Sequence, residues 1–97
     1  MSMPGGFDNA KEATDDVKTL AKNMKEKVQE QLGETFETFD AVLYTTQVVA
    51  GTNYLIKVKV GDEKFVHIKI YVPLPFRNAP NELLSAEGDK AFLDPLV

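Results

Sequence analysis

The hydrophobic positions that follow Thr14 repeat with the period of an α-helix. One stripe is formed by Val17, Leu20, Ala21, Met24, Val28 and Leu32, and lysine, glutamate and glutamine fill the other positions. Thr14 or Asp15 can cap the first N–H groups, and Gly33 can adopt the left-handed conformation that ends a helix. The pattern therefore predicts one amphipathic helix that ends near Gly33.

After Gly33 the hydrophobic positions alternate with a period of two, which is typical of half-buried strands. A turn at Gly61 and Asp62 separates two such runs and predicts a hairpin. The inward face is expected to hold Tyr54, Ile56, Val58, Val60, Val66, Ile68, Ile70 and Val72. The outward face is expected to hold Leu55, Lys57, Lys59, His67, Lys69 and Tyr71.

Residues 36–49 are rich in aromatic and β-branched side chains and predict an earlier strand, with Val42 and Tyr44 facing inward. The Ala50-Gly51 pair turns this strand into the next one. Residues 80–97 are less clear, because Leu83 and Leu84 favour a strand, whereas Gly88, Asp94 and Pro95 favour a loop. We expect an α+β fold in which the helix packs across an antiparallel meander sheet of four to five strands.

The composition places this fold in a single domain, residues 1–97, of which residues 1–10 form a flexible trunk and residues 80–97 an uncertain tail. The chain has no cysteine, which excludes a disulfide framework and favours a cytoplasmic protein. The sequence contains neither a secretory signal pattern nor an apolar run of transmembrane length. A net charge of -4 disfavours nucleic acid and anionic membranes as partners.

Catalytic chemistry has little support in the sequence. His67 is the one histidine, no serine or threonine stands near it in a recognisable arrangement, and the chain lacks cysteine. We expect His67 to have a cross-strand partner instead of a catalytic or metal-binding role. Helix carboxylates such as Glu26 and Glu30 are typical of a solvated face. The sequence predicts no enzyme activity, no cofactor and no metal site.

Two turns are unusually apolar for segments that normally carry polar residues. The first is Gln47-Val48-Val49-Ala50-Gly51, in which the valines are stiff and the glycine permits a tight reversal. The second is Val72-Pro73-Leu74-Pro75-Phe76, in which two prolines end the strand and leave Leu74 and Phe76 displayed. In a meander, both turns lie at the same end of the sheet.

These turns carry a resemblance to a known family. The first turn, which continues as Thr52-Asn53-Tyr54, resembles the first inhibitory loop of the cystatins, and in particular of the stefins (type 1 cystatins). Met3-Pro4-Gly5-Gly6 resembles the N-terminal trunk of stefins, and Leu74-Pro75 resembles their second loop. The similarity extends from the N-terminus to about Asn78, with the three motifs in the stefin order.

The resemblance implies a reversible, tight-binding inhibitor of papain-like cysteine proteases of the cathepsin type. The trunk and both loops would form a wedge that fills the active-site cleft without being cleaved. The implied contact residues are Met3, Pro4, Gly5, Gly6, Gln47, Val48, Val49, Ala50, Gly51, Leu74, Pro75 and Phe76. The first loop is also the hinge between two strands, so a monomer that can exchange into a domain-swapped dimer is expected.

The chain also departs from the stefin pattern. Pro73 precedes the Leu-Pro pair, Phe76-Arg77 replaces the small or amide residues that stefins more often have, and residues 83–97 match the usual final strand poorly. These departures support an alternative hypothesis, in which the chain is a cystatin-fold scaffold or interaction module, natural or engineered, that has lost protease inhibition.

Overall fold

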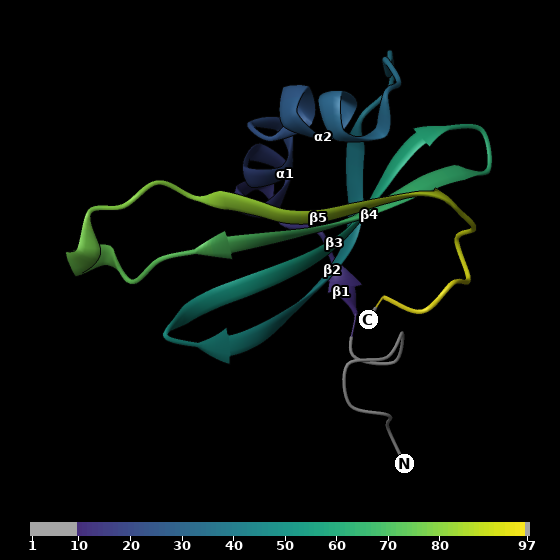
Figure 1. The fold of residues 1–97 in the computed structure, drawn as a ribbon. Coiled ribbons are helices and arrows are strands. Elements are labelled where there is room, and N and C mark those ends of the chain that lie inside the picture. The colour runs from purple at the N-terminus through teal and green to yellow at the C-terminus, as the bar shows by residue number, and fades with distance from the viewer. Residues whose placement is uncertain (1–9, 97) are drawn as a thin grey trace.

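The computed structural model describes residues 10–96, which form one antiparallel sheet with two helices on one of its faces (Figure 1). The elements in chain order are β1 (Lys11–Glu12), α1 (Asp15–Lys22), α2 (Lys25–Leu32), β2 (Asp40–Val49), β3 (Gly51–Gly61), β4 (Lys64–Val72), the 3-10 helix η2 (Pro75–Arg77) and β5 (Glu82–Lys90). The strands are neighbours in the order β1-β2-β3-β4-β5, which confirms the predicted α+β meander. Within residues 10–96, neither helix has the length and apolar character needed to cross a membrane.

The predicted single helix is divided into two short helices. The Thr14 hydroxyl caps α1 by accepting a hydrogen bond of 3.3 Å from the N–H of Val17, and Gly33 ends α2 with a φ of 69°. Between the helices, the N–H of Met24 donates to the carbonyl of Ala21, only three residues earlier. Asn23, a poor helix former whose side chain competes for backbone groups, stands at this tightened turn.

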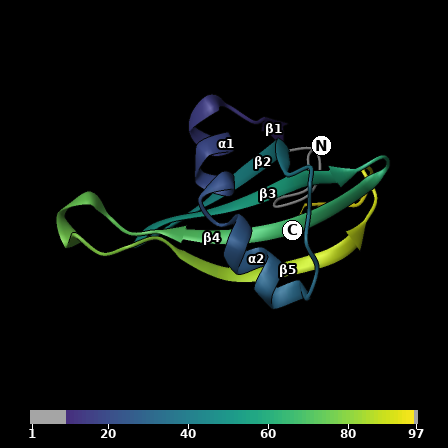
Figure 2. The same ribbon diagram turned by 90° about the horizontal axis from the view of Figure 1, so that it is seen from above.

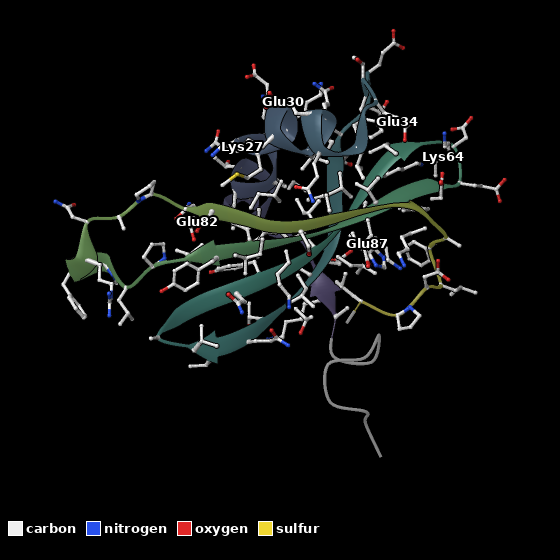
Figure 3. All side chains as sticks on the ribbon, in the orientation of Figure 1. Lys27, Glu30, Glu34, Lys64, Glu82 and Glu87 are labelled. Atoms are coloured by element: carbon white, nitrogen blue, oxygen red, sulfur yellow. The ribbon has the colours of Figure 1, made fainter. Side chains whose placement is uncertain are left out.

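The core lies between the helices and the sheet. In Figure 2, α1 lies over β2 and α2 over β5, in agreement with the contacts between these elements. Glu30 projects from α2 away from the sheet (Figure 3), as expected for the solvated face. The buried core residues are Val17, Ala21, Met24, Val28, Phe36, Ala41, Ile56, Val58, Val66, Ile68 and Ile70.

A β-bulge changes which side chains of β2 face the core. Ala41 pairs with Val58, but Leu43 pairs with Lys57, so Val42 is the extra residue. Ala41 is buried and Tyr44 packs against the core, whereas Val42 does not belong to the core cluster. The inward position predicted for Tyr44 is confirmed, and the one predicted for Val42 is wrong because the bulge shifts the alternation.

The opposite face of the sheet is also covered, which the alternating pattern did not predict. After β5, residues 91–96 fold back beneath the sheet, and we call them the C-terminal strap (Figure 1). Leu55, Lys57 and His67, expected to face solvent, are 2%, 0% and 6% exposed, and Leu96 of the strap is 1% exposed. These three residues lie on the predicted face, but the prediction that this face is solvated is wrong for them.

The tail left unassigned in the sequence divides into two parts. Residues 82–90 form β5, which pairs antiparallel with β4 from Tyr71↔Glu82 to Phe65↔Lys90. Residues 91–96 form the C-terminal strap, in which the N–H of Ala91 donates a 2.8 Å hydrogen bond to the Asp94 carboxylate. The fold therefore reaches the upper limit of the predicted four to five strands.

Candidate functional site

The first loop is a reversal of one residue between β2 and β3. Val49 pairs with Gly51, so Ala50 stands alone at the apex. Val48 is 89% exposed and Val49 is 47% exposed. Two stiff β-branched side chains are thus presented to solvent at the tip of a long hairpin, where their ordering has little further entropic cost.

Gly51 is required by the geometry of this turn. Its φ of 121° is a conformation that side-chain-bearing residues rarely adopt. A Cβ atom at this position would lie 2.6 Å from the carbonyl oxygen of Val72 on β4. The close approach of β4 to the turn therefore depends on the missing side chain.

The second loop begins where β4 ends at Val72. Pro73 and Pro75 cannot donate to a strand ladder, and Pro75 instead begins η2. The N–H of Arg77 donates to the carbonyl of Leu74 at 3.0 Å, which closes this short helix. Phe76 is 80% exposed and Leu74 is partly exposed. The predicted exposure is therefore confirmed for Phe76 and only partly confirmed for Leu74.

Both loops lie at the same end of the sheet. Thr52, the second residue of β3, pairs directly with Val72, the last residue of β4. In Figure 1 the β2–β3 hairpin and η2 project together on the side away from the C-terminal strap. The structure thus brings Gln47, Val48, Val49, Ala50, Gly51, Leu74, Pro75 and Phe76 to one edge, which we call the two-loop edge.

The trunk residues Met3, Pro4, Gly5 and Gly6 lie outside the described residues. The described chain begins at Ala10 and enters the sheet through β1, where Lys11 pairs with Tyr44. The trunk contact therefore stays a prediction.

The two-loop edge has the chemistry of a contact surface. Its exposed side chains are mainly apolar, with Arg77 beside them as the one charged group of η2. In residues 10–96, no group of three or more histidine, cysteine, aspartate or glutamate side chains is placed to hold a metal ion. Such an edge can exclude water when it packs against a partner. Its residues include no pair of side chains that could act as general acid and general base.

His67 lies on the strap side of the sheet, away from the two-loop edge. Burial lowers the pKa of His67 to about 4, and the positive charges of Lys57 and Lys90 act in the same direction. Its Nε2 atom is buried and has no hydrogen-bond partner among residues 10–96. Its register partners are Lys57 on β3 and Glu87 on β5, so it has the expected cross-strand neighbours, whereas the expected exposure to solvent is wrong because the side chain is 6% exposed.

Tyr71 is the residue at this edge that sequence reasoning did not assign to the site. Its hydroxyl donates a hydrogen bond to the carbonyl oxygen of Ala50, at the apex of the first loop. The alternation places Tyr71 on the face opposite the helices, but only the register of three strands brings its ring to the turn. The sequence carries no local signal for this contact.

Comparisons with known proteins agree with the fold. A Cystatin domain matches residues 5–92. The chain is 45% identical to Cystatin-A1 of Sus scrofa over 98% of this chain and 92% of that protein. It is 40% identical to Stefin-C of Bos taurus over 96% of this chain and 92% of that protein. It is 38% identical to Leukocyte cysteine proteinase inhibitor 1 of Sus scrofa over 98% of this chain and 92% of that protein. The chain therefore belongs to the cystatin family and is a stefin-type member of it.

Proposed function

We propose that this chain is a reversible, tight-binding inhibitor of papain-like cysteine proteases of the cathepsin type. The observation that carries the proposal is the two-loop edge, where Val48 and Phe76 are 89% and 80% exposed at one end of the sheet. Membership of the cystatin family supports the same role, because the family consists of protease inhibitors. The chain is accordingly an inhibitor and not an enzyme.

The mode of inhibition that fits this edge is occlusion. Two projecting apolar loops can enter a cleft and exclude water from it, with a few buried anchors supplying most of the binding energy. Interfaces of this class bury about 1,600 Å² in total. The backbone of the first loop reverses at Ala50 instead of running extended, so it is a poor substrate mimic. We therefore expect the inhibitor to leave the complex uncleaved.

The trunk completes the proposed wedge. Met3 and Pro4 would occupy non-primed subsites, and Gly5 would let the backbone pass close to the cleft wall. Gln47, Val48, Val49, Ala50 and Gly51, together with Leu74, Pro75 and Phe76, would cover the primed side. The trunk assignment rests on the resemblance of its four residues to stefins.

Titration of active papain with the inhibitor tests the proposal. One inhibitor molecule should abolish the activity of one enzyme molecule, and mass spectrometry should recover the intact chain after dissociation. A serine protease of similar size provides the control, since its cleft has a different shape. Inhibition that requires cleavage at Val49 or Ala50 would contradict the proposal.

Phe76 and Arg77 favour a second candidate function. A large exposed aromatic ring beside a positive charge can serve a partner other than a protease. In that case the chain would be a cystatin-fold interaction module that has lost inhibition. The titration separates the two functions, because a correctly folded chain that leaves papain fully active supports the module and excludes the inhibitor.

Location and assembly belong to the same proposal. A cytoplasmic location is supported by the absence of cysteine from all 97 residues. The net charge of -4 supports a protein partner over nucleic acid or an anionic membrane. The free chain would be a monomer that exchanges its helices and β2 into a domain-swapped dimer when the first loop straightens.

A further inference from the structure

Tyr71 connects β4 to the apex of the first loop. It pairs in register with Asn53 of β3, and its side chain reaches past that strand's end. The hydroxyl donates a hydrogen bond to the carbonyl oxygen of Ala50, which lies 21 positions earlier in the chain. A residue two strands away from β2 therefore contacts the point at which β2 turns back.

The Tyr71 ring also covers the turn. A Cβ atom at Gly51 would lie 2.8 Å from Cε1 of the ring and 3.0 Å from its hydroxyl oxygen. The ring therefore lies against the α-carbon of this glycine, which explains why Gly51 is buried while the neighbouring Ala50 is exposed. The hydroxyl and the ring act on the same reversal, one through a hydrogen bond and the other by packing.

The reversal benefits from such a restraint because it has few other contacts of its own. Val48 and Val49 are extended residues of β2 that could continue into a straight strand, and they are 89% and 47% exposed. The last pair of the β2–β3 ladder is Val49↔Gly51, so the ladder does not extend to Ala50. A continuous strand through residues 48–52 would remove the turn and carry the Ala50 carbonyl away from Tyr71.

We propose that Tyr71 is a positioning residue that latches the first loop in its turned form. The latch deepens the proposed function and rests on it, because the turned loop is the form that would enter a protease cleft. It also opposes the straightened form that strand exchange requires. Tyr71 itself need not contact the protease, and it acts by holding Ala50.

The expected effect of the latch is modest and measurable. The net contribution of one hydrogen bond between uncharged groups corresponds to about a three- to tenfold change in an equilibrium. Loss of the hydroxyl should lower the population of the turned loop relative to opened forms by that factor. Apparent affinity falls in proportion to the competent fraction only where opened forms are well populated, so loop dynamics are the more direct measurement.

The test compares Tyr71→Phe, which keeps the ring and removes the hydroxyl, with Tyr44→Phe as the matched control. Tyr44 is a β2 tyrosine that stacks against Tyr54 on the helix side, away from the turn. Both full-length variants are studied by nuclear magnetic resonance without any protease present. The carbonyl ¹³C shift of Ala50 and amide exchange at residues 48–52 report on the latch, and global unfolding by denaturant is measured alongside.

In Tyr71→Phe we expect an upfield shift of the Ala50 carbonyl carbon and about three- to tenfold faster exchange at residues 48–52. Tyr44→Phe should leave both signals as in the wild type. Unchanged loop signals in Tyr71→Phe would overturn the proposal. Exchange that rises equally throughout β3 and β4 would also overturn it, because it would show general destabilisation.

Papain binding provides the functional arm of the same experiment. If the wild type inhibits papain, Tyr71→Phe should associate with it more slowly than Tyr44→Phe does, because a smaller fraction of the free inhibitor holds the turned loop. If the wild type does not inhibit papain but the loop signals change as expected, the latch is supported and the proposed function fails. If the wild type inhibits and the loop signals of Tyr71→Phe do not change, the proposed function stands and the latch fails.

Discussion

The ammonium group of Lys57 donates a 2.8 Å hydrogen bond to the carbonyl oxygen of Asp94, although 37 positions separate the two residues. The same group donates to the carbonyl oxygens of Phe92 and, at 3.4 Å, of Ala91, and it lies 5.2 Å from the centre of the Phe92 ring. Lys57 is fully buried, so these acceptors replace the water that a lysine normally keeps. The C-terminal strap is therefore held through a side chain of the central strand.

Replacement of Lys57 by methionine should weaken this attachment. The substitution keeps an unbranched apolar stem but leaves the strap carbonyls without their donor, which should reduce the free energy of unfolding by about 2 kcal/mol. Lys59→Met is the matched control, because Lys59 lies two positions along β3 and is partly exposed. Denaturant unfolding measures both variants. Equal stability of the two would show that the strap is held by packing alone.

His67 should make stability depend on pH below neutrality. Burial and the charges of Lys57 and Lys90 lower the pKa of His67 from 6.5 to about 4, while Asp94 and Glu87 oppose this shift. Glu87, labelled in Figure 3, pairs in register with His67 in the β4–β5 ladder. Between pH 6.5 and pH 4 the unfolded chain binds a proton at His67 that the folded chain does not bind.

The contribution of neutral His67 is therefore fully present above pH 6.5 and is lost as the pH falls toward 4. We expect a loss on the order of 2–3 kcal/mol in the free energy of unfolding over this range. His67→Gln removes the titrating group and serves as the reference, so the difference between the two pH profiles isolates His67. Parallel profiles would show that the imidazole is charged as readily in the folded chain as in the unfolded one.

Gly51→Ala should distort the first loop. The new Cβ atom would meet the Val72 carbonyl oxygen at 2.6 Å and would also force alanine to adopt a φ of 121°. Gly33→Ala is the matched control, since Gly33 also has positive φ but open space around it. Unfolding measurements should show a loss of about 1 kcal/mol at Gly33 and a larger loss at Gly51. Equal losses would mean that β4 moves aside without cost.

Mild heating at high concentration should produce a domain-swapped dimer that does not inhibit papain. Straightening the first loop lets β2, which ends at Val48 and Val49, continue into β3 as one strand, and the native core is rebuilt from two chains. Val48→Asp, which is more compatible with a turn, should lower the yield of dimer. Size-exclusion chromatography followed by a papain assay of each fraction decides the outcome. A fully inhibitory dimer would show that the hinge lies elsewhere.

Removal of residues 1–6 should weaken papain binding by a few kcal/mol, mainly through faster dissociation, as expected for loss of one anchor of an interface. Gly5→Glu tests the same contact without shortening the chain, because a side chain would clash where the backbone passes the cleft wall. Gly6→Ala is a milder comparison at the adjacent glycine. A dissociation constant that neither the deletion nor Gly5→Glu changes would remove the trunk from the site.

The sequence predicted the elements whose signals are local. The stripe from Val17 to Leu32 and the alternation around Ile56 and Ile68 depend only on which side chains face the core, so both were recognisable. The strap was not recognisable, because lysine at an outward position of a strand is normally solvated. The burial of Lys57 is decided by carbonyl groups that lie 34 to 37 residues further along the chain.

The candidate site divides in the same way. The two loops were found because apolar side chains such as Val48 and Phe76 occupy turns, where polar residues are usual. Tyr71 was missed because its contact with Ala50 depends on the register of three strands, and a period of two fixes only the face of a side chain. The break at Asn23 was missed because one weak helix former does not interrupt a hydrophobic stripe.

The two loops differ in how firmly the sheet specifies their length. The first joins Val49 to Gly51 through one residue, and Gly51 has a φ of 121° and no room for a Cβ atom, so the length and sequence of this loop are narrowly specified. The second occupies residues 73–81 between Val72 and Glu82, and pairing resumes at Tyr71↔Glu82 whatever lies between. Combinatorial libraries that vary η2 in sequence and length should therefore yield folded variants with new target preferences, whereas libraries in the first loop should yield fewer stable members.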